Sequence, residues 1–315
     1  GSVASCHGDA AQGRRGIAAT VHPLATDAAL DAFQQGGNAI DAAVAAALML
    51  GVVDGHNSGL GGGCLMLVRL ANGRMAAIDG REAAPLAASR DMFVRNGKAD
   101  PQLSQTGPLA AGVPGALMAY DHAVKNFGRL KLSGLLRNAA QLAEDGFRIE
   151  PAYAERLKSE ARELNLFAAS RAIYLHANGS PKAAGEILKQ PDLAQTYRAI
   201  AAQGIGWFYD GPFGRVTGDW MAQHGGLLSA ADFALYRIRL REPIVTSYRG
   251  HSIVGFPPPS SGGVHVAQIL NTLAGLLLVS AAAVLVPWLW SRGRWRTLSL
   301  LAWLVLYALP TTVVP

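Results

Sequence analysis

The pattern of hydrophobic and polar positions predicts strands near both ends of the body of the chain and helices between them. Strand-like apolar runs cover residues 16–21, 64–70 and 75–78, and the Asn-Gly turn at 71–73 predicts that the last two runs form a hairpin. Helical patterns follow at residues 23–35, 39–50, 115–127, 132–145, 152–164 and 194–203. The strand pattern returns at residues 237–240, 244–248 and 252–256. This order predicts an α+β fold in which helices cover a mixed sheet with an antiparallel component.

The helix predicted over residues 39–50 is apolar nearly all round, with Asp41 as the exception. Asn38 stands directly before it and is a candidate N-cap, because its side chain can accept from free amides of the first turn. A helix of this composition is buried on most sides, so the fold needs layers that cover it.

The end of the chain has a different character. Residues 272–290 and 297–315 are two runs without a charged side chain, and each approaches the ~20 apolar residues that cross a bilayer. The three arginines of the loop Ser291 to Arg296 favour the cytoplasmic side. We therefore expect a two-span transmembrane hairpin over residues 272–315, with this loop cytoplasmic and the body extracytoplasmic and membrane-anchored. The alternative is a pair of buried core helices.

These patterns divide the chain into a flexible N-terminus at residues 1–13, a body at 14–271 and the hairpin at 272–315. Val3 to Cys6 has the residue types found at a bacterial lipoprotein cysteine, which would agree with a location outside the cytoplasm. The alternative is a chance cysteine in a flexible terminus.

Composition removes several classes of function. The net charge is +6, but the tail supplies three arginines and no acid, which leaves 25 basic and 22 acidic side chains before it. This mixed surface gives no support for a nucleic-acid partner. Two cysteines are too few for a disulfide framework or a Cys-rich zinc module, and the eight histidines show no metal-ligand spacing. We therefore expect no metal site.

The segment Asp79–Pro85 is the main candidate for chemistry. It places Arg81 between the carboxylates of Asp79 and Glu82, where a predicted strand ends and beside a proline that restricts the chain. A guanidinium held in this way can bind a substrate carboxylate in a bidentate manner. The alternative is a surface ion-pair cluster.

A glycine-rich segment at residues 57–63, with glycines at positions 59 and 61–63, precedes the predicted strand at residues 64–70. They allow a ligand or another stretch of backbone to approach closely, and the alternative is a tightly packed turn. A strand follows them where a dinucleotide-binding or phosphate-binding loop would have a helix, so neither of those motifs is present.

Four segments of the body resemble the large-subunit part of the gamma-glutamyltransferases, also called glutathione hydrolases. They are residues 16–63, 79–85, 107–128 and 255–273, which occur in the order found in that family and together cover roughly residues 14–273. The resemblance implies an N-terminal-nucleophile hydrolase fold, a sandwich of helix, sheet, sheet and helix layers. This chain would contribute the large-subunit half, so the sandwich would be incomplete.

The resemblance also implies the reaction. A precursor cuts itself in two, and the N-terminal threonine of the small subunit attacks the gamma-glutamyl amide of glutathione or a similar compound, with its own α-amino group as base. Water, an amino acid or a peptide then resolves the acyl-enzyme, without a metal or organic cofactor. The family arginine in the position of Arg81 binds the α-carboxylate of the glutamyl group, which makes Arg81 the expected substrate-binding residue. The matching glycine-rich segment lies near the floor of the active site.

The chain departs from the family beyond residue 273. Family members continue into further helices and a threonine-threonine-histidine motif at the cut site, whereas Val313 follows Thr311 and Thr312 here. We therefore expect no catalytic nucleophile in this chain, a separately supplied small subunit as partner, and no activity of the chain alone. The tail would come from another protein.

Two other functions stay open. The chain could be a catalytically dead, membrane-anchored remnant or fusion product. It could also belong to a related acylase or to an amidase that processes poly-gamma-glutamate. An arginine at position 81 favours substrates with a free glutamyl α-carboxylate.

Overall fold

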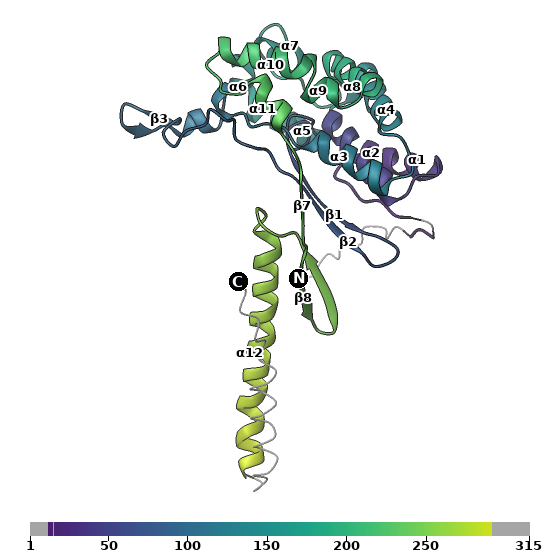
Figure 1. Ribbon diagram of the computed structural model, residues 1–315, viewed down its shortest axis with the longest axis vertical. Helices are drawn as coiled ribbons and strands as arrows, with labels where there is room; N and C mark the ends of the chain where they lie inside the picture. Colours follow the sequence, from purple (N-terminus) through teal and green to yellow (C-terminus); the bar gives the residue numbers. More distant parts are fainter. Residues whose placement is uncertain (1–11, 15, 292–315) are drawn as a thin grey trace, which may run out of the picture. The chain divides into compact units, whose positions relative to one another are not determined.

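The computed structural model describes residues 12–14 and 16–291 (Figure 1). The chain forms two compact units. The first unit combines Gly1–Met66 with Ile78–Arg239, and the second combines Leu67–Ala77 with Leu240–Pro315. The chain passes between the units within strands of one sheet.

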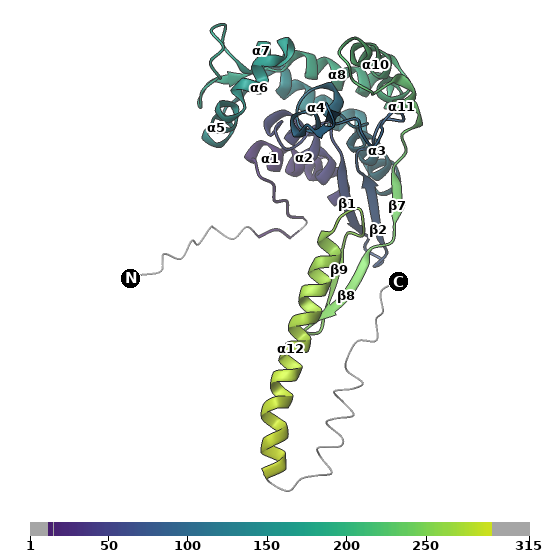
Figure 2. The same cartoon turned by 90° about the vertical axis from the view of Figure 1, so that its left-hand side faces the viewer.

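Helices make up most of the first unit. Helix α2 packs against α1, α3 and α4, and α4 packs in turn against α8, so that these helices form one layer (Figures 1 and 2). The helices of this unit are α1 (Pro23–Gln34), α2 (Ala39–Val53), α3 (Ala116–Phe127), α4 (Leu132–Asp145), α5 (Pro151–Ser159), α6 (Ala161–Leu166), α7 (Ala168–Tyr174), α8 (Pro191–Gln203), α9 (Gly206–Tyr209), α10 (Pro212–Gln223) and α11 (Ala230–Leu235), with two short 3₁₀ turns at Pro101–Ser104 and Pro108–Ala110.

The strands form one three-stranded sheet and three short antiparallel pairs among the described residues. The three-stranded sheet has the order β1 (Cys64–Arg69), β2 (Met75–Gly80) and β7 (Arg239–Arg241). The pairs are β3 (Val94–Arg95) with β4 (Lys98–Ala99), β5 (Phe147–Arg148) with β6 (Ile187–Leu188), and β8 (Ile244–Tyr248) with β9 (His251–Gly255). Strands β1 and β2 follow one another through the predicted turn, where Gly73 has the positive φ of 85° that favours glycine.

Helix α2 lies at the centre of the helical layer, as its composition predicts. Val44, Leu48 and Val52 on this helix are at most 1% exposed. The helix begins with a capping box, because the Asn38 side chain accepts from the amide of Asp41 and the Asp41 carboxylate accepts from the amide of Asn38. The prediction of a capped helix that is buried on most sides is confirmed.

The Asp41 carboxylate also holds the loop that joins α3 to α4. It is fully buried and accepts from the backbone amides of Arg129, at 2.9 Å, and Leu130, at 3.0 Å. Gly128 makes this approach possible, because a Cβ there would lie 2.5 Å from an Asp41 oxygen. A buried carboxylate is stable only when donors surround it, and here they are backbone amides from two parts of the chain.

The second unit contains the β8–β9 hairpin and one long helix, α12 (Gly262–Ser291). The hairpin pairs Ile244 with Gly255 and Tyr248 with His251. Helix α12 packs against both strands (Figure 2), and the Thr246 hydroxyl lies 3.2 Å from the Asn271 side-chain oxygen.

The predicted transmembrane hairpin at residues 272–315 is wrong. None of the helices within residues 12–14 and 16–291 is long and apolar enough to cross a membrane. The first charge-free run is instead the continuation of α12, which begins ten residues earlier at Gly262 and packs on β8 and β9. Absence of charge over residues 272–290 is therefore not evidence of a separate element. Residues 292–315, and with them the second predicted span and the Arg292, Arg294 and Arg296 side chains, lie outside the described part of the chain.

Other differences concern short elements. Residues 16–21 do not form a strand, and Ile17 and Val21 are exposed, so no neighbour supplies the pairing and burial that a strand requires. The helix predicted over 152–164 breaks at Glu160 into α5 and α6. Helices α7, α9, α10 and α11 were not predicted, because segments of four to twelve residues carry a weak periodic signal.

We predict that Asp41→Asn lowers the free energy of unfolding by about 2 to 4 kcal/mol, because the amide group of asparagine would face backbone amides with its own donors. Urea unfolding followed by circular dichroism measures this change. The matched control is Asp31→Asn at an exposed position of α1, where the change should stay within about 0.5 kcal/mol. Equal effects of the two substitutions would contradict the role of Asp41.

Candidate functional site

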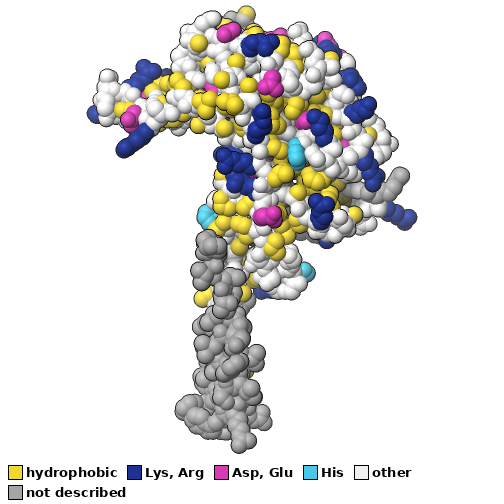
Figure 3. Space-filling model, in the orientation of Figure 1, with side chains coloured by type: hydrophobic (Ala, Val, Ile, Leu, Met, Phe, Trp, Pro, Cys, Tyr) yellow, Lys and Arg dark blue, Asp and Glu magenta, His cyan; other side chains and the backbone are white. Residues whose placement is uncertain are grey.

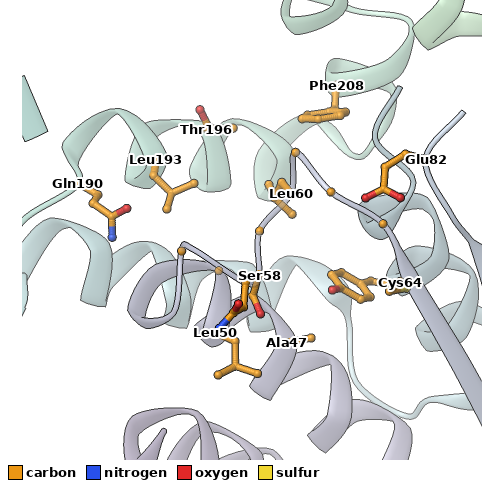
Figure 4. Close-up of a pocket in the computed structure, with 18 of the residues that line it drawn as sticks. Ala47, Leu50, Ser58, Leu60, Cys64, Glu82, Gln190, Leu193, Thr196 and Phe208 are labelled. Atoms are coloured by element: carbon orange, nitrogen blue, oxygen red, sulfur yellow. The ribbon is translucent and has the colours of Figure 1, made fainter. Parts of the chain in front are cut away.

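The first unit contains a cavity of about 720 Å³ beside the glycine-rich segment. Figure 4 shows that Ser58 and Leu60 of this segment, Gln190 directly before α8, Leu193 and Thr196 of α8, and Phe208 of α9 surround it. The side chains of Glu82 and Cys64 lie at one end, where strand β1 begins. The cavity thus has an apolar and aromatic lining with a carboxylate at one end, as small-molecule sites commonly have.

Backbone atoms from three parts of the chain approach each other closely at this end of the cavity. The amides of Gly115 and Ala116, at the start of α3, both donate to the Gly62 carbonyl at 3.0 Å. A Cβ on Gly63 would lie 2.7 Å from the Gly80 carbonyl oxygen and 2.8 Å from a carboxylate oxygen of Glu82. The glycine-rich segment is therefore first of all a packing device, which places Glu82 against the start of β1.

Arg81 follows the last residue of strand β2, as predicted. Its amide donates to the Asp79 carboxylate at 3.0 Å, and its Nε atom lies 3.6 Å from Glu82 Oε2. The arginine side chain is 66% exposed, so a solute can reach the guanidinium. Arg81 does not line the cavity, whereas Glu82 does. Glu82 contacts Arg81 and also lines the cavity, so its carboxylate lies between Arg81 and the glycine-rich segment.

The Cys64 thiol stays protonated in this position, and the protonated form is a poor nucleophile. Burial raises its pKa to about 12, and the nearby carboxylates of Glu82 and Asp79 add to the shift. Both causes act against the thiolate, which is the reactive form of cysteine. Among the described residues no cluster of three or more His, Cys, Asp or Glu side chains could hold a metal ion.

Sequence reasoning missed Tyr236, the C-cap residue of α11, which contacts the candidate site. Its hydroxyl donates to the Arg81 carbonyl at 2.8 Å across a sequence separation of 155 residues. No local motif could have found this contact, because neither residue carries a signal that depends on the other. It also missed Phe208 of the cavity lining, since α9 was not predicted.

The comparisons with known proteins agree with this geometry. The sequence model of the gamma-glutamyltranspeptidase family matches residues 25–285. The acylase ACY 1 proenzyme of Pseudomonas sp. strain V22 is 41% identical over 86% of this chain, and the glutathione hydrolase proenzyme of Escherichia coli K12 is 40% identical over 82%. The crystal structure of Helicobacter pylori gamma-glutamyltranspeptidase superposes with a TM-score of 0.81 and 38% identity, over 83% of this chain and 75% of that one. The chain therefore belongs to the gamma-glutamyltranspeptidase family.

The chain covers about half of the length of these curated relatives, namely 50% of the acylase proenzyme and 45% of the glutathione hydrolase proenzyme.

We predict that the Cys64 thiol reacts with 5,5′-dithiobis(2-nitrobenzoic acid) at pH 8 at least about 100-fold more slowly in the folded protein than in guanidinium chloride. The Cys6→Ser variant leaves Cys64 as the sole thiol, which assigns the absorbance change. Since the folded pKa is about 12 against an ordinary value of 9.0, this group also makes the folded state less stable as pH rises above about 9. Fast labelling of the folded Cys6→Ser variant would contradict the buried, neutral thiol.

We predict that Gly63→Ala lowers the free energy of unfolding by about 1 to 3 kcal/mol. The new Cβ would overlap the carbonyl of Gly80, which is part of the backbone of strand β2 and cannot rotate away as a side chain could. Gly61→Ala is the matched control, since a Cβ there would meet nothing within 4 Å. Chemical denaturation of both variants provides the comparison. If the two variants unfold at the same denaturant concentration, the close backbone approach at Gly63 is not a constraint.

Proposed function

We propose that this chain binds the gamma-glutamyl group of glutathione and related compounds and forms, with a small subunit, an enzyme that cleaves and transfers this group. The observation that carries the proposal is the Asp79–Pro85 segment at the end of β2, in a chain of the gamma-glutamyltranspeptidase family. There the Arg81 guanidinium is accessible while its backbone is fixed on both sides.

Arg81 is the group that would bind the substrate. A guanidinium offers two parallel N–H donors to a carboxylate, which fixes both the position and the orientation of the substrate. The α-carboxylate of a gamma-glutamyl compound is separated from the scissile amide by the side chain of the glutamyl residue. Holding the carboxylate at Arg81 would therefore place that amide at a set distance, where a nucleophile from another subunit can reach it.

The nucleophile in this proposal is the N-terminal threonine of the small subunit. Its hydroxyl attacks the amide carbonyl while its own α-amino group takes the proton, and the amine leaves as the acyl-enzyme forms. Water or the amino group of an acceptor then breaks the ester. The named relatives that are called proenzymes support a precursor that yields two subunits.

The surface of the chain supports a partner. Leu65 and Leu67 alternate with Met66 and Val68 along β1, and they are 37% and 40% exposed although they lie in the central sheet. In the space-filling view apolar side chains lie among charged ones on the surface (Figure 3). A sheet sandwich completed by a small subunit would cover such side chains.

A second candidate function is that of an acylase. It is favoured by the 41% identity to the acylase ACY 1 proenzyme. The two functions differ in whether the acyl group carries a free α-carboxylate for Arg81. Comparing turnover of gamma-glutamyl-p-nitroanilide with that of 4-aminobutyryl-p-nitroanilide, which lacks only the α-carboxylate, distinguishes them.

We also propose that the body of the chain lies outside the cytoplasm and that it ends at residue 271. Fractionation of cells that produce the chain, with marker enzymes for each compartment, tests the first. The catalytically dead remnant is the outcome that remains if no small subunit restores turnover.

We predict that Arg81→Ala, assayed with a small subunit of the family, raises the KM for gamma-glutamyl-p-nitroanilide and lowers kcat/KM by about 30-fold or more, corresponding to a loss of about 2 to 5 kcal/mol. The matched control is Arg74→Ala, which removes an exposed arginine from the turn after β1 and should leave both constants unchanged. An unchanged KM in Arg81→Ala would remove the proposed role. Absence of turnover in the unaltered two-subunit protein would contradict the proposed function as a whole.

A further inference from the structure

We propose that Tyr236 is a positioning residue for Arg81: its hydroxyl fixes the main chain of Arg81 and thereby the place at which the guanidinium meets the substrate carboxylate. The inference rests on the proposed function, because it assigns a role to Tyr236 through Arg81. It adds a residue from α11, far along the chain, to the substrate site.

Both polar groups of the Arg81 main chain are held by side chains. The amide donates to the Asp79 carboxylate at 3.0 Å, and the carbonyl accepts from the Tyr236 hydroxyl at 2.8 Å. A third restraint follows two residues later, where Ala83 exchanges two backbone hydrogen bonds with Val113. Arg81 therefore has an exposed side chain on a backbone that is fixed before, at and after it.

The position of Tyr236 is itself set by α11. This helix begins with a capping box between Ser229 and Asp232, and Tyr236 is its C-cap, directly after Leu235. The Asp232 carboxylate also accepts from the amide of Leu86 at 2.6 Å. Helix α11 thus contacts the Arg81 segment at two points, one on each side of Pro85, which fixes the distance between the phenol and the strand end.

The ring of Tyr236 is buried and packs against another aromatic ring. It is 6% exposed and lies parallel to the Tyr209 ring, with centroids 5.9 Å apart and an interplanar angle of 13°. The Tyr209 hydroxyl donates to the Pro114 carbonyl at 3.0 Å and accepts from the amide of Met118 at 3.2 Å. Tyrosines from α9 and α11 therefore connect the start of α3 with Arg81.

Gly115 is required for this arrangement. A Cβ at that position would collide with the Tyr236 hydroxyl and with the Gly80 carbonyl. The hydroxyl therefore occupies space that a side chain of any other residue would fill, directly beside the residue that precedes Arg81. A general contribution to the core would not need an oxygen at this place, whereas fixing the Arg81 carbonyl does.

The hydrogen bond persists over the working range of pH. Burial raises the pKa of Tyr236 to about 12, with further contributions from the negative charges of Asp79 and Glu82. The phenol consequently keeps its proton, and remains a donor, at pH values well below 12. A phenylalanine at this position would keep the ring and leave the Arg81 carbonyl without this donor.

The first test is the Tyr236→Phe variant in the two-subunit enzyme. We expect the KM for gamma-glutamyl-p-nitroanilide to rise about five- to tenfold, the effect of one lost hydrogen bond, with kcat changed less than about twofold because carboxylate binding precedes the chemical step. In an Arg81→Ala background the same substitution should add less than about twofold, since the group that it positions is gone.

Tyr197→Phe is the matched control. The Tyr197 hydroxyl also donates to a backbone carbonyl, that of Leu48 at 3.0 Å, and its side chain is fully buried. The two substitutions remove the same kind of bond from the same unit, so a general loss of stability affects both variants. Only Tyr236→Phe should change KM.

The second test does not depend on turnover. Hydrogen–deuterium exchange of the full chain, read at the amide of Arg81, should be faster by about tenfold in Tyr236→Phe and unchanged in Tyr197→Phe, because the Arg81–Asp79 bond opens when the carbonyl is released. Unchanged exchange at Arg81 overturns the inference whether or not the enzyme is active. Faster exchange with an unchanged KM in an active enzyme overturns it as well, and leaves the proposed function intact. Faster exchange in a protein that shows no turnover contradicts the proposed function while the control of Arg81 by Tyr236 stands.

Discussion

The candidate site depends on one close approach of backbones, at the carbonyl of Gly80. Gly63 and Gly115 both approach this carbonyl, and a Cβ on either residue would overlap it. Gly80 in turn has no room for a side chain, because a Cβ there would lie 2.7 Å from the Cβ of Ala119. Strand β1, strand β2 and helix α3 can therefore meet only through glycine. This constraint brings Glu82 against the glycine-rich segment and directs the chain so that Arg81 emerges at the surface.

A fixed backbone beneath an exposed arginine suits a carboxylate-binding role. An arginine on a mobile loop would lose conformational entropy both in its side chain and in its backbone when it binds. Here the backbone part of that loss has already occurred on folding, since Asp79 and Tyr236 hold the amide and the carbonyl of Arg81. Only the side chain remains to be ordered by the ligand. The inert thiol of Cys64 and the apolar cavity behind Glu82 leave this guanidinium as the group of the described site best suited to recognise an anion.

The sequence allowed prediction of the parts of the fold that depend on local pattern. Helix α2 followed from a long apolar run with Asn38 before it, and the β1–β2 connection followed from an Asn-Gly turn. Arg81 could be predicted as a site residue because its carboxylate neighbours and the whole segment that resembles the family lie next to it in the sequence. Tyr236 could not, since its contact with Arg81 spans 155 residues and depends on how α9, α11 and α3 pack. The tail was misjudged for a related reason, because a run without charges gives no information about where its helix begins, and α12 starts at Gly262 on the β8–β9 hairpin.

The central claim is that Arg81, on its fixed backbone, binds the α-carboxylate of the gamma-glutamyl group. A crystal structure of this chain with a small subunit and bound L-glutamate tests it most directly. The account predicts two nitrogens of the Arg81 guanidinium within about 3 Å of the two oxygens of the α-carboxylate, with the Tyr236 hydroxyl still on the Arg81 carbonyl. Glutamate bound elsewhere, or bound with its α-carboxylate away from an Arg81 that stays on Glu82, would contradict it.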